Sequence, residues 1–206
     1  MTPAINLAKK RGLDYQLHEY THDSNAASFG LEAAEKLGVD VAQVFKTLVV
    51  VAEVGTLAVA ILPVDKTLNF KKMAKALSSN KILPCKKVQM ADPKQVERST
   101  GYVLGGVSPL GQKKRLATII DISAEAHTTM YVSGGRRGLE IELPPLRERK
   151  EDIQPLAEQF LRSVMEQTGR EIEGFTNAAI ECLETHHWPG NVRELIHAVE
   201  RAAFLG

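Results

Sequence analysis

The hydrophobic positions follow two different patterns, and the change between them falls near residue 143. Before it, short apolar runs rich in β-branched residues alternate with amphipathic segments, without a regular βαβ period. Runs bounded by Gly, Pro or Asp predict strands, here at 44–52, 56–64, 102–107 and 116–122. Helices are predicted at 5–13, 31–39 and 69–77, and a hairpin at 128–143 with its turn at 134–138. This irregular mixture predicts an α+β fold with a mixed sheet.

A proline-marked and then charged stretch, 144–152, opens the second part of the chain. From Ile153 to Met165 the apolar residues recur three and four positions apart, which predicts one amphipathic helix. Gly169 is a suitable residue to end it. We therefore expect two domains, at 1–143 and 144–206.

Two further helices are predicted in this second domain. Thr176 can cap one of them, and Asn191 can cap the other, with Glu194 three residues later as in a capping box. The domain is then a small all-α unit, near the lower size limit for an independent core.

One residue disagrees with its surroundings. The run 44–52 holds Phe45, Leu48 and four valines, yet it also contains Lys46. A lysine that loses its hydration costs several kcal/mol unless an anion or other acceptors receive its ammonium group. Lys46 therefore either meets a ligand or extends its amine to water from a half-exposed strand.

Composition and charge narrow the class of protein. Apolar content of 44% and charged content of 25% are typical of a globular protein that is soluble in water. The first residues show no apolar signal segment, so we expect a cytoplasmic location and no membrane partner. The net charge of +1 divides into +5 for residues 1–143 (19 basic, 14 acidic) and −4 for 144–206 (7 basic, 11 acidic). The basic first part favours a polyanionic partner.

The two cysteines, Cys85 and Cys182, lie far apart and lack a paired metal-ligand spacing. We expect two free thiols and no structural zinc or other metal site. The sequence also gives no sign of a cofactor.

Two glycine-rich stretches, 101–115 and 133–140, are candidates for chemistry beside Lys46. Paired glycines let the backbone approach a ligand, and their N–H groups can hold an anion or a polarised carbonyl. Basic residues follow each pair, so an ester at the end of a phosphate-bearing polymer would suit such a pocket. Hairpin turns alone would also explain the glycines, and the residues by themselves leave both interpretations open.

The usual hydrolytic machinery is not evident. The sequence contains no GxSxG, HExxH or complete Walker A motif. His18 and His22 flank Tyr20 and could act as acid–base groups, although the sequence favours a turn or capping role for either. Ser108 has no partner in the sequence that would mark it as a nucleophile.

Longer strings of this sequence resemble a known family. "HEYTHDSNAASFGLEAAEKLGVD", "VFKTLVV", "KKVQMADPKQVERSTGYVLGGVSPLGQKKRL" and "YVSGGRRGLEIEL" are similar to the YbaK family, specifically to its Cys-tRNA(Pro) deacylases. The similarity extends over residues 1–143. It implies an editing domain like the one inserted in bacterial prolyl-tRNA synthetases. It also implies tRNA(Pro) charged with cysteine as substrate, prolyl-tRNA synthetase as a partner, and no DNA partner.

The resemblance also implies roles for single residues. Tyr20 and Phe29 would wall the aminoacyl pocket, and Lys46 would meet the phosphate or ribose at the 3′ end of the tRNA.

The backbone of Gly105 and Gly106 would hold the ester carbonyl, while Ser133 and Glu140 would complete the pocket. In the mechanism that the family implies, the thiol of the bound cysteine attacks its own ester and leaves as a thiolactone. The protein would contribute orientation and backbone donors in place of a nucleophile.

Some positions depart from the family pattern. Residues 78–85 form a longer link than usual, and the turn at 52–56 is shorter. Ala117 stands where proline is usual, and Glu140 where aspartate often occurs. The insertion at 78–85 is either a surface bulge or a disturbance of the neighbouring lysines.

The second domain resembles a different family. "LPPLRERKEDIQPLAEQFL" and "WPGNVREL" are similar to the helical lid of NtrC-type enhancer-binding ATPases. In that family, the arginine that corresponds to Arg193 of this chain contacts the nucleotide phosphates. The chain contains no phosphate loop or metal-binding strand of such an ATPase, so we expect no ATPase activity and a structural or vestigial role for Arg193. A chimera of two families, natural or constructed, would have this sequence.

Three functions remain open at this stage. The first is an aminoacyl-tRNA deacylase with a passive helical appendage. The second is an inactive module that binds tRNA or a synthetase. The third is a regulatory fragment that docks on ATPase subunits through the lid-like helices.

Overall fold

The computed structural model describes residues 1–13, 15–26, 28–79, 82–127 and 129–205, without the side chains of Glu125, Arg193 and Leu205. Two residues of the predicted insertion, at 80 and 81, and the Arg193 side chain therefore lie outside the described part. The chain divides into two compact units, Met1–Leu143 and Pro144–Gly206. No helix in the described ranges is long and apolar enough to cross a membrane.

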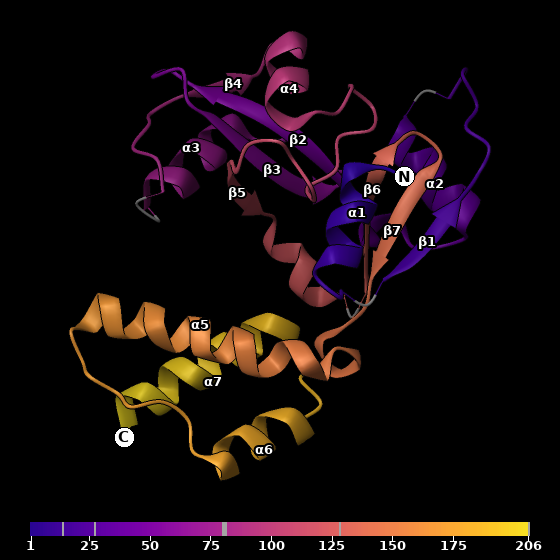
Figure 1. Cartoon of the computed structure of the whole chain (residues 1–206). Coiled ribbons are helices and arrows are strands. Elements are labelled where there is room, and N and C mark those ends of the chain that lie inside the picture. The colour runs from indigo at the N-terminus through magenta and orange to yellow at the C-terminus, as the bar shows by residue number, and fades with distance from the viewer. Residues whose placement is uncertain (14, 27, 80–81, 128, 206) are drawn as a thin grey trace. The chain divides into compact units, whose positions relative to one another are not determined.

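The first unit is built on a mixed sheet. In its described part the sheet has seven strands: six follow the order β1-β7-β6-β2-β3-β5, and the seventh, β4, pairs with β2 outside this path. The strands are β1 (Gln16–Glu19), β2 (Val44–Ala52), β3 (Leu57–Pro63), β4 (Val88–Met90), β5 (Ala117–Ile120), β6 (Met130–Arg136) and β7 (Leu139–Leu143). The β2–β6 and β3–β5 pairs are parallel, and the others are antiparallel (Figure 1). The predicted α+β class with a mixed sheet is confirmed.

Helices cover both faces of this sheet, which explains why β2 is apolar apart from Lys46 and Thr47. The helices are α1 (Pro3–Lys10), α2 (Phe29–Leu37), α3 (Phe70–Ser79) and α4 (Pro93–Thr100), with short 3₁₀ turns at Val41–Gln43 and Ile122–Ala126. Phe45 and Val49 belong to one buried cluster, together with residues of α1 and α4. Val50 and Ala52 belong to a second cluster, together with residues of α3. Successive residues of a strand point to opposite faces, so both clusters draw on the same strand.

Several predicted boundaries differ from the structure. The apolar run 102–107 is a loop and not the predicted strand, because Gly105 takes a φ of +86° that turns the chain away from extended geometry. The first helix begins at Pro3, since Thr2 caps it and proline suits the first helical position. The second begins at Phe29 behind the cap of Ser28. Strands β1 and β4 and helix α4 were not predicted.

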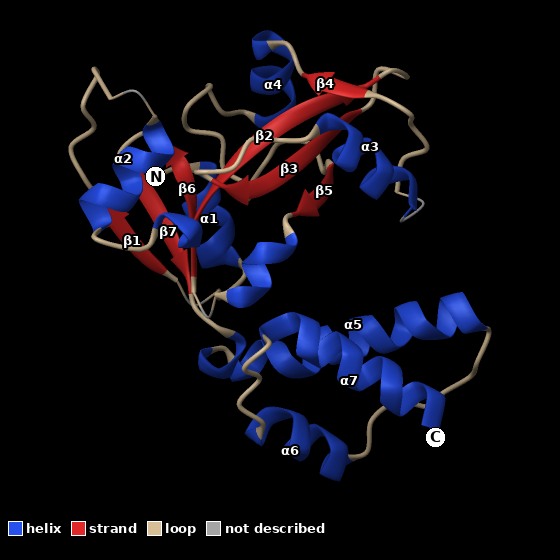
Figure 2. Ribbon diagram, turned by 180° about the vertical axis from the view of Figure 1, so that it is seen from behind, coloured by secondary structure: helices blue, strands red, loops and turns tan. Residues whose placement is uncertain are grey.

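The second unit consists of helices. They are α5 (Lys150–Thr168), α6 (Asn177–Thr185) and α7 (Asn191–Leu205), preceded by a 3₁₀ turn at Leu146–Glu148. Helices α5 and α7 lie side by side in both views (Figure 2). The predicted ends are confirmed where Gly169 closes α5 with a φ of +69° and Thr176 caps α6. Nine buried residues form the core of this unit: Leu146, Ile153, Ala157, Leu161, Val164, Trp188, Leu195, Val199 and Ala203.

The start of α7 differs in detail from the predicted capping box. Glu194 accepts a hydrogen bond from the N–H of Gly190 at 2.9 Å. Asn191 Oδ1 accepts from the N–H of Leu146 at 2.7 Å, which ties the start of α7 to the turn before α5. Glu194 thus accepts from Gly190 and not, as the predicted box requires, from Asn191, and the asparagine side chain joins two parts of the unit.

This core allows a test of whether the helical unit unfolds as its own cooperative structure. Leu195 is fully buried in it, so Leu195→Ala should lower the stability of the second unit by about 2–5 kcal/mol. The single tryptophan of the chain, Trp188, belongs to the same core, so its fluorescence during urea unfolding should report the loss.

The matched control is Leu17→Ala, at a leucine of the first unit that is 41% exposed, and it should leave the tryptophan transition unchanged. An unchanged midpoint in Leu195→Ala would show that the helices do not form the packed unit described above.

Candidate functional site

One edge of β2 is only partly covered by other strands, and this gap creates the pocket of the first unit. Strand β3 pairs with β2 along one edge, from Phe45 to Val51. The other edge is shared, since β6 pairs with Val44 and Phe45 and β4 pairs with residues 50–52. No strand in the described part pairs with residues 46–48 on that side. Strands β2 and β6 therefore separate after two residues, and a cavity opens between them.

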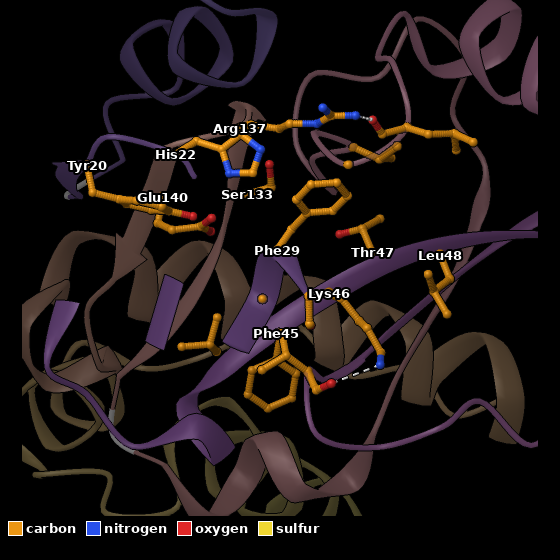
Figure 3. Close-up of a pocket in the computed structure, with 17 residues that line it drawn as sticks. Tyr20, His22, Phe29, Phe45, Lys46, Thr47, Leu48, Ser133, Arg137 and Glu140 are labelled. Atoms are coloured by element: carbon orange, nitrogen blue, oxygen red, sulfur yellow. Dashed lines mark hydrogen bonds between the residues drawn. The ribbon is translucent and has the colours of Figure 1, made fainter. Parts of the chain in front are cut away.

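This cavity measures about 270 Å³, close to the lower end of small-ligand pockets. Six of the seven predicted site residues line it: Tyr20, Phe29, Lys46, Gly105, Ser133 and Glu140. They come from the segment after β1, from α2, β2, the loop 101–116, β6 and β7, and Figure 3 shows all of them except Gly105 with labels. The fold thus brings together residues that are distant in the sequence.

Lys46 enters the pocket from the unpaired part of β2. Its Nζ donates a hydrogen bond to the carbonyl oxygen of Val64 at 3.0 Å (Figure 3). Burial lowers the pKa of this amine, and the nearby carboxylate of Asp65 opposes that effect. An ammonium group has three donors, so an anion in the pocket could take up the remaining ones.

Glu140 lies on the opposite wall, on β7. It is 8% exposed, and burial raises its pKa from 4.5 to about 8. Tyr20 lies beside it in Figure 3. Burial, and then the charges of Glu140 and Glu32, raise the pKa of the tyrosine hydroxyl to about 12. At neutral pH this wall therefore presents a protonated carboxyl group and a protonated phenol, both of which can donate hydrogen bonds.

The mouth of the pocket is formed by the Phe29 ring and its neighbours. Arg137 stacks over this ring with its guanidinium carbon 4.5 Å from the centroid, and its Nη2 donates to the carbonyl of Leu104. On the other side, the His22 ring lies 5.3 Å from the Phe29 ring. His22 Nδ1 lies 2.7 Å from Glu32 Oε2, and the N–H of Asp23, followed by His22, lowers the pKa of that carboxyl group. Phe29 is thus held in place by two contacts.

The two glycines of the loop have different surroundings. A Cβ on Gly105 would lie 2.7 Å from Arg137 Nε and 2.9 Å from the Phe29 ring, so a side chain there would fill the pocket mouth. Gly106 is not among the described residues that line the pocket, and its N–H donates to the carbonyl of Val103 at 3.1 Å. A Cβ on Gly106 would lie 2.9 Å from the Cα of Arg136. Gly106 therefore lets the loop pack against β6.

Among the described residues, no hydroxyl group of the pocket is hydrogen-bonded to a histidine. Ser133 Oγ accepts from the N–H of Gly135, and Ser28 Oγ accepts from the N–H of Leu31. The other two residues considered from the sequence have structural contacts: His18 pairs with Glu142, and Ser108 Oγ accepts from the N–H of Leu110. Both cysteines are free thiols, and neither lines the pocket in its described part.

Sequence reasoning missed two polar residues of this region. Thr47 lines the pocket, and its buried hydroxyl has no hydrogen-bond partner among the described residues. Glu32 is a buried carboxylate on an otherwise alanine-rich side of α2. Thr47 follows Lys46 directly and is the next polar residue in an apolar strand, which is the signal that could have indicated it. Nothing in the local sequence marks Glu32.

Comparison with known proteins finds one family match in each part of the chain. Residues 23–150 match the family described as the aminoacyl-tRNA editing domain, and residues 147–206 match the AAA+ ATPase lid domain. Over 144 residues the chain is 37% identical to a protein of Enterococcus faecalis named "Putative Cys-tRNA(Pro)/Cys-tRNA(Cys) deacylase EbsC". That alignment covers 70% of this chain and 84% of EbsC.

The remaining similarities concern the fold and the helical unit. The crystal structure of the hypothetical protein APE2540 superposes with a TM-score of 0.59 at 26% identity, covering 81% of this chain and 94% of that one. A protein described as "a putative trans-editing enzyme for prolyl tRNA synthetase" shares the fold at a TM-score of 0.58 and 22% identity, over 69% of this chain and 84% of that one.

For the helical unit, the alginate regulator AlgB of Pseudomonas aeruginosa is 51% identical over 65 residues. These are 32% of this chain and 14% of AlgB, so the chain spans a small part of that regulator. The editing-domain match, in contrast, extends over more than half of this chain, and EbsC is matched over most of its length. On this evidence, the chain belongs to the aminoacyl-tRNA editing domain family.

Proposed function

We propose that the first unit removes cysteine from mischarged Cys-tRNA(Pro), with the thiol of the substrate as the nucleophile. One observation carries this proposal. The pocket gathers a lysine, a neutral buried acid and a glycine backbone, but none of its described hydroxyl groups is hydrogen-bonded to a histidine. Such a site can orient and polarise an ester, and it leaves the attack to a group that the substrate brings.

The reaction then proceeds within the bound aminoacyl group. The cysteine Sγ attacks the ester carbonyl carbon, forms a C–S bond and pushes the carbonyl electrons onto oxygen. When this intermediate collapses, the C–O bond to the ribose breaks, and the ribose oxygen takes up the proton that the thiol has lost. The products are a cyclic thiolactone of cysteine and uncharged tRNA.

In this proposal, backbone and side chains of the pocket hold the carbonyl group. The N–H of Gly105 is the backbone donor that we assign to the developing oxyanion, because the N–H of Gly106 is used within the loop. The unpartnered hydroxyl of Thr47 and the neutral carboxyl group of Glu140 can supply further hydrogen bonds. Ser133 and Tyr20 bound the space that receives the small side chain.

Lys46 serves the nucleic-acid end of the substrate. Its ammonium is anchored on the Val64 carbonyl and has donors left for a phosphate or ribose oxygen at the 3′ end. A cavity of about 270 Å³ suits an aminoacyl end and not a tRNA body, so it gives no means to distinguish one tRNA from another. We therefore propose that a partner such as prolyl-tRNA synthetase supplies that selectivity.

The role of Lys46 is tested by Lys46→Ala. Loss of one charge-assisted contact is worth about 1.5–3 kcal/mol, so kcat/KM for Cys-tRNA(Pro) should fall by roughly 10- to 150-fold. Release of labelled cysteine measures the rate, with Lys36→Ala at an exposed lysine of α2 as the matched control. If the two variants are equally active, Lys46 does not have the assigned role.

The role of the substrate thiol is tested with other amino acids on the same tRNA. Seryl and alanyl esters fit the same space but cannot form a thiolactone, so they should be released at least ~100-fold more slowly than cysteine. Mass spectrometry should detect the thiolactone as the first product from cysteine. Equal rates for the three esters would show that water, and not the thiol, is the nucleophile.

The protonation of Glu140 gives a pH-dependent prediction. Burial raises its pKa above the ordinary 4.5 to about 8. The stability that the neutral side chain contributes is therefore fully present below pH 4.5 and is lost as the pH rises through about 8. Glu140→Gln keeps a neutral side chain and should match the wild type near pH 6. Toward pH 9 the ionised wild type places a negative charge near the oxyanion, so kcat/KM of the variant relative to wild type should rise about tenfold.

Taking this ratio at each pH removes the ionisation of the substrate thiol, which is common to both proteins. The unfolding free energy of Glu140→Gln relative to wild type should increase over the same range. A glutamine variant that is already inactive near pH 6 would mean that the reaction needs the ionised carboxylate.

A further inference from the structure

A second hollow of the first unit lies between α1 and the segment 109–118, and its lining is strongly basic. It measures about 810 Å³ and carries five cationic side chains: Lys10, Arg11, Lys113, Lys114 and Arg115. None of the described residues that line this basic groove is Asp or Glu. None of its five cations forms an ion pair with a carboxylate in the described ranges.

The backbone that carries these cations is fixed by hydrogen bonds. The N–H of Lys113 donates to the carbonyl of Thr100 at 3.1 Å, and the N–H of Lys114 donates to the carbonyl of Ser99 at 2.9 Å. Both bonds fasten the loop to the end of α4, which is itself packed in the core. The basic groove is therefore preformed, and a ligand would need to order only the side-chain ends.

The other wall of the basic groove is equally close-fitting. Gly111 packs against the start of α1, where a Cβ would lie 2.4 Å from the carbonyl oxygen of Pro3. Gly111 also has a φ of +65°, which favours glycine for a second reason. Tyr102 Oη donates to the carbonyl of Leu110 at 2.7 Å and holds the same loop from inside.

The loop connects the basic groove with the pocket. Leu104, Gly105 and Val107 of the loop contribute to the pocket wall, and the groove lining starts two residues after Val107, at Pro109. On β6, Gly134 accepts a hydrogen bond from the hydroxyl of Thr2, at the start of α1, and follows Ser133 of the pocket directly. The pocket and the basic groove thus share the loop 101–116, and the start of α1 beside the groove is hydrogen-bonded to β6 of the pocket.

The lining chemistry indicates which part of a nucleic acid would bind. Lysine and arginine without acidic neighbours attract phosphates, and the salt dependence of binding reflects the number of phosphates neutralised. Proteins that hold single strands usually add aromatic side chains on which bases stack. No described residue of the basic groove is aromatic, so it suits a phosphodiester backbone better than unpaired bases.

We propose that the basic groove binds the phosphate backbone of the tRNA body while the 3′ end occupies the pocket. This assignment rests on the proposed function in one respect, namely that the RNA is a tRNA. It provides affinity for tRNA without regard to sequence, which agrees with a deacylase that depends on a partner for selectivity.

The test compares two charge-reversed pairs in the full chain. Lys114→Glu/Arg115→Glu alters the basic groove, and Lys86→Glu/Lys87→Glu alters another exposed, adjacent pair by the same net charge. Binding of uncharged tRNA(Pro) is measured by fluorescence anisotropy at several salt concentrations. The groove variant should lose about tenfold or more in affinity, and its salt slope should fall by roughly 1.4–1.8, or 0.7–0.9 per phosphate contact.

The control pair should change the affinity by less than about threefold and leave the slope unaltered. Thermal unfolding by circular dichroism verifies that both variants are folded. Equal losses in the two variants would overturn the proposal, because affinity would then follow net charge alone. Absence of wild-type binding to uncharged tRNA at low salt would also overturn it.

Deacylation assays separate this proposal from the proposed function. The groove variant should release cysteine from a cysteinyl ester of adenosine, which lacks the tRNA body, as fast as wild type does. A loss on that small substrate equal to the loss on Cys-tRNA(Pro) would contradict an RNA-binding role. Groove-dependent tRNA binding without any wild-type deacylation would retain the basic groove and refute the proposed function.

Discussion

Strands β2 and β6 pair as parallel neighbours at Val44 and Phe45 only, and the site depends on this short pairing. A longer ladder would join Lys46 and Thr47 to β6 and close the space that the pocket occupies. Strand β4 covers the same edge again from Val50 onward, so the opening is limited to the residues between these two contacts. The sheet remains intact because β3 holds the opposite edge of β2 along seven paired residues. A local interruption in a well-supported strand thus produces a cavity without a large cost in stability.

The loop 101–116 is related to the same short pairing, because it lines the pocket where no described strand pairs with residues 46–48 of β2. It does so without forming a strand, and its glycines allow close contact on both sides. Gly105 leaves room for the Phe29 ring and Arg137, while Gly111 allows contact with α1. The charged side chains are also divided between the pocket and the basic groove. The pocket contains a buried neutral acid and one lysine, whereas the basic groove carries the concentrated positive charge. Chemistry and nucleic-acid attraction are therefore assigned to neighbouring but different surfaces.

The sequence was informative where a pattern is local. The run 44–52 predicted β2 with its bounds, and the hairpin at 128–143 was also predicted. Its turn lies at 137–138 and not over the whole of 134–138, because Gly134 and Gly135 belong to β6, where the register shifts. The run 102–107 was misleading, since Tyr102 and Val107 are buried as a strand would bury them, although Gly105 bends the chain. Strand β1 has four residues, too few for a periodic signal, and its place in the sheet is set by its pairing with β7.

In the candidate site, too, only the features with a local sequence signal could be predicted. Lys46 was identified because a charge in an apolar run has a physical cost, whereas six scattered residues were assigned by family resemblance. Only the fold shows that five of these six share one cavity with Lys46 and that Gly106 does not line it. Burial of Glu32 and Glu140 depends on contacts between distant segments, so their shifted pKa values could not be predicted from neighbours in the sequence.

The most direct test of this account is a crystal structure of the full chain with a stable amide analogue of 3′-cysteinyl-adenosine. The account predicts that the analogue lies between β2 and β6. Its carbonyl oxygen should accept a hydrogen bond from the N–H of Gly105, and its ribose should face Lys46 Nζ. An analogue bound outside this gap, or one whose carbonyl contacts neither Gly105 nor Thr47, would contradict the central claim that the gap in the sheet is the reaction site.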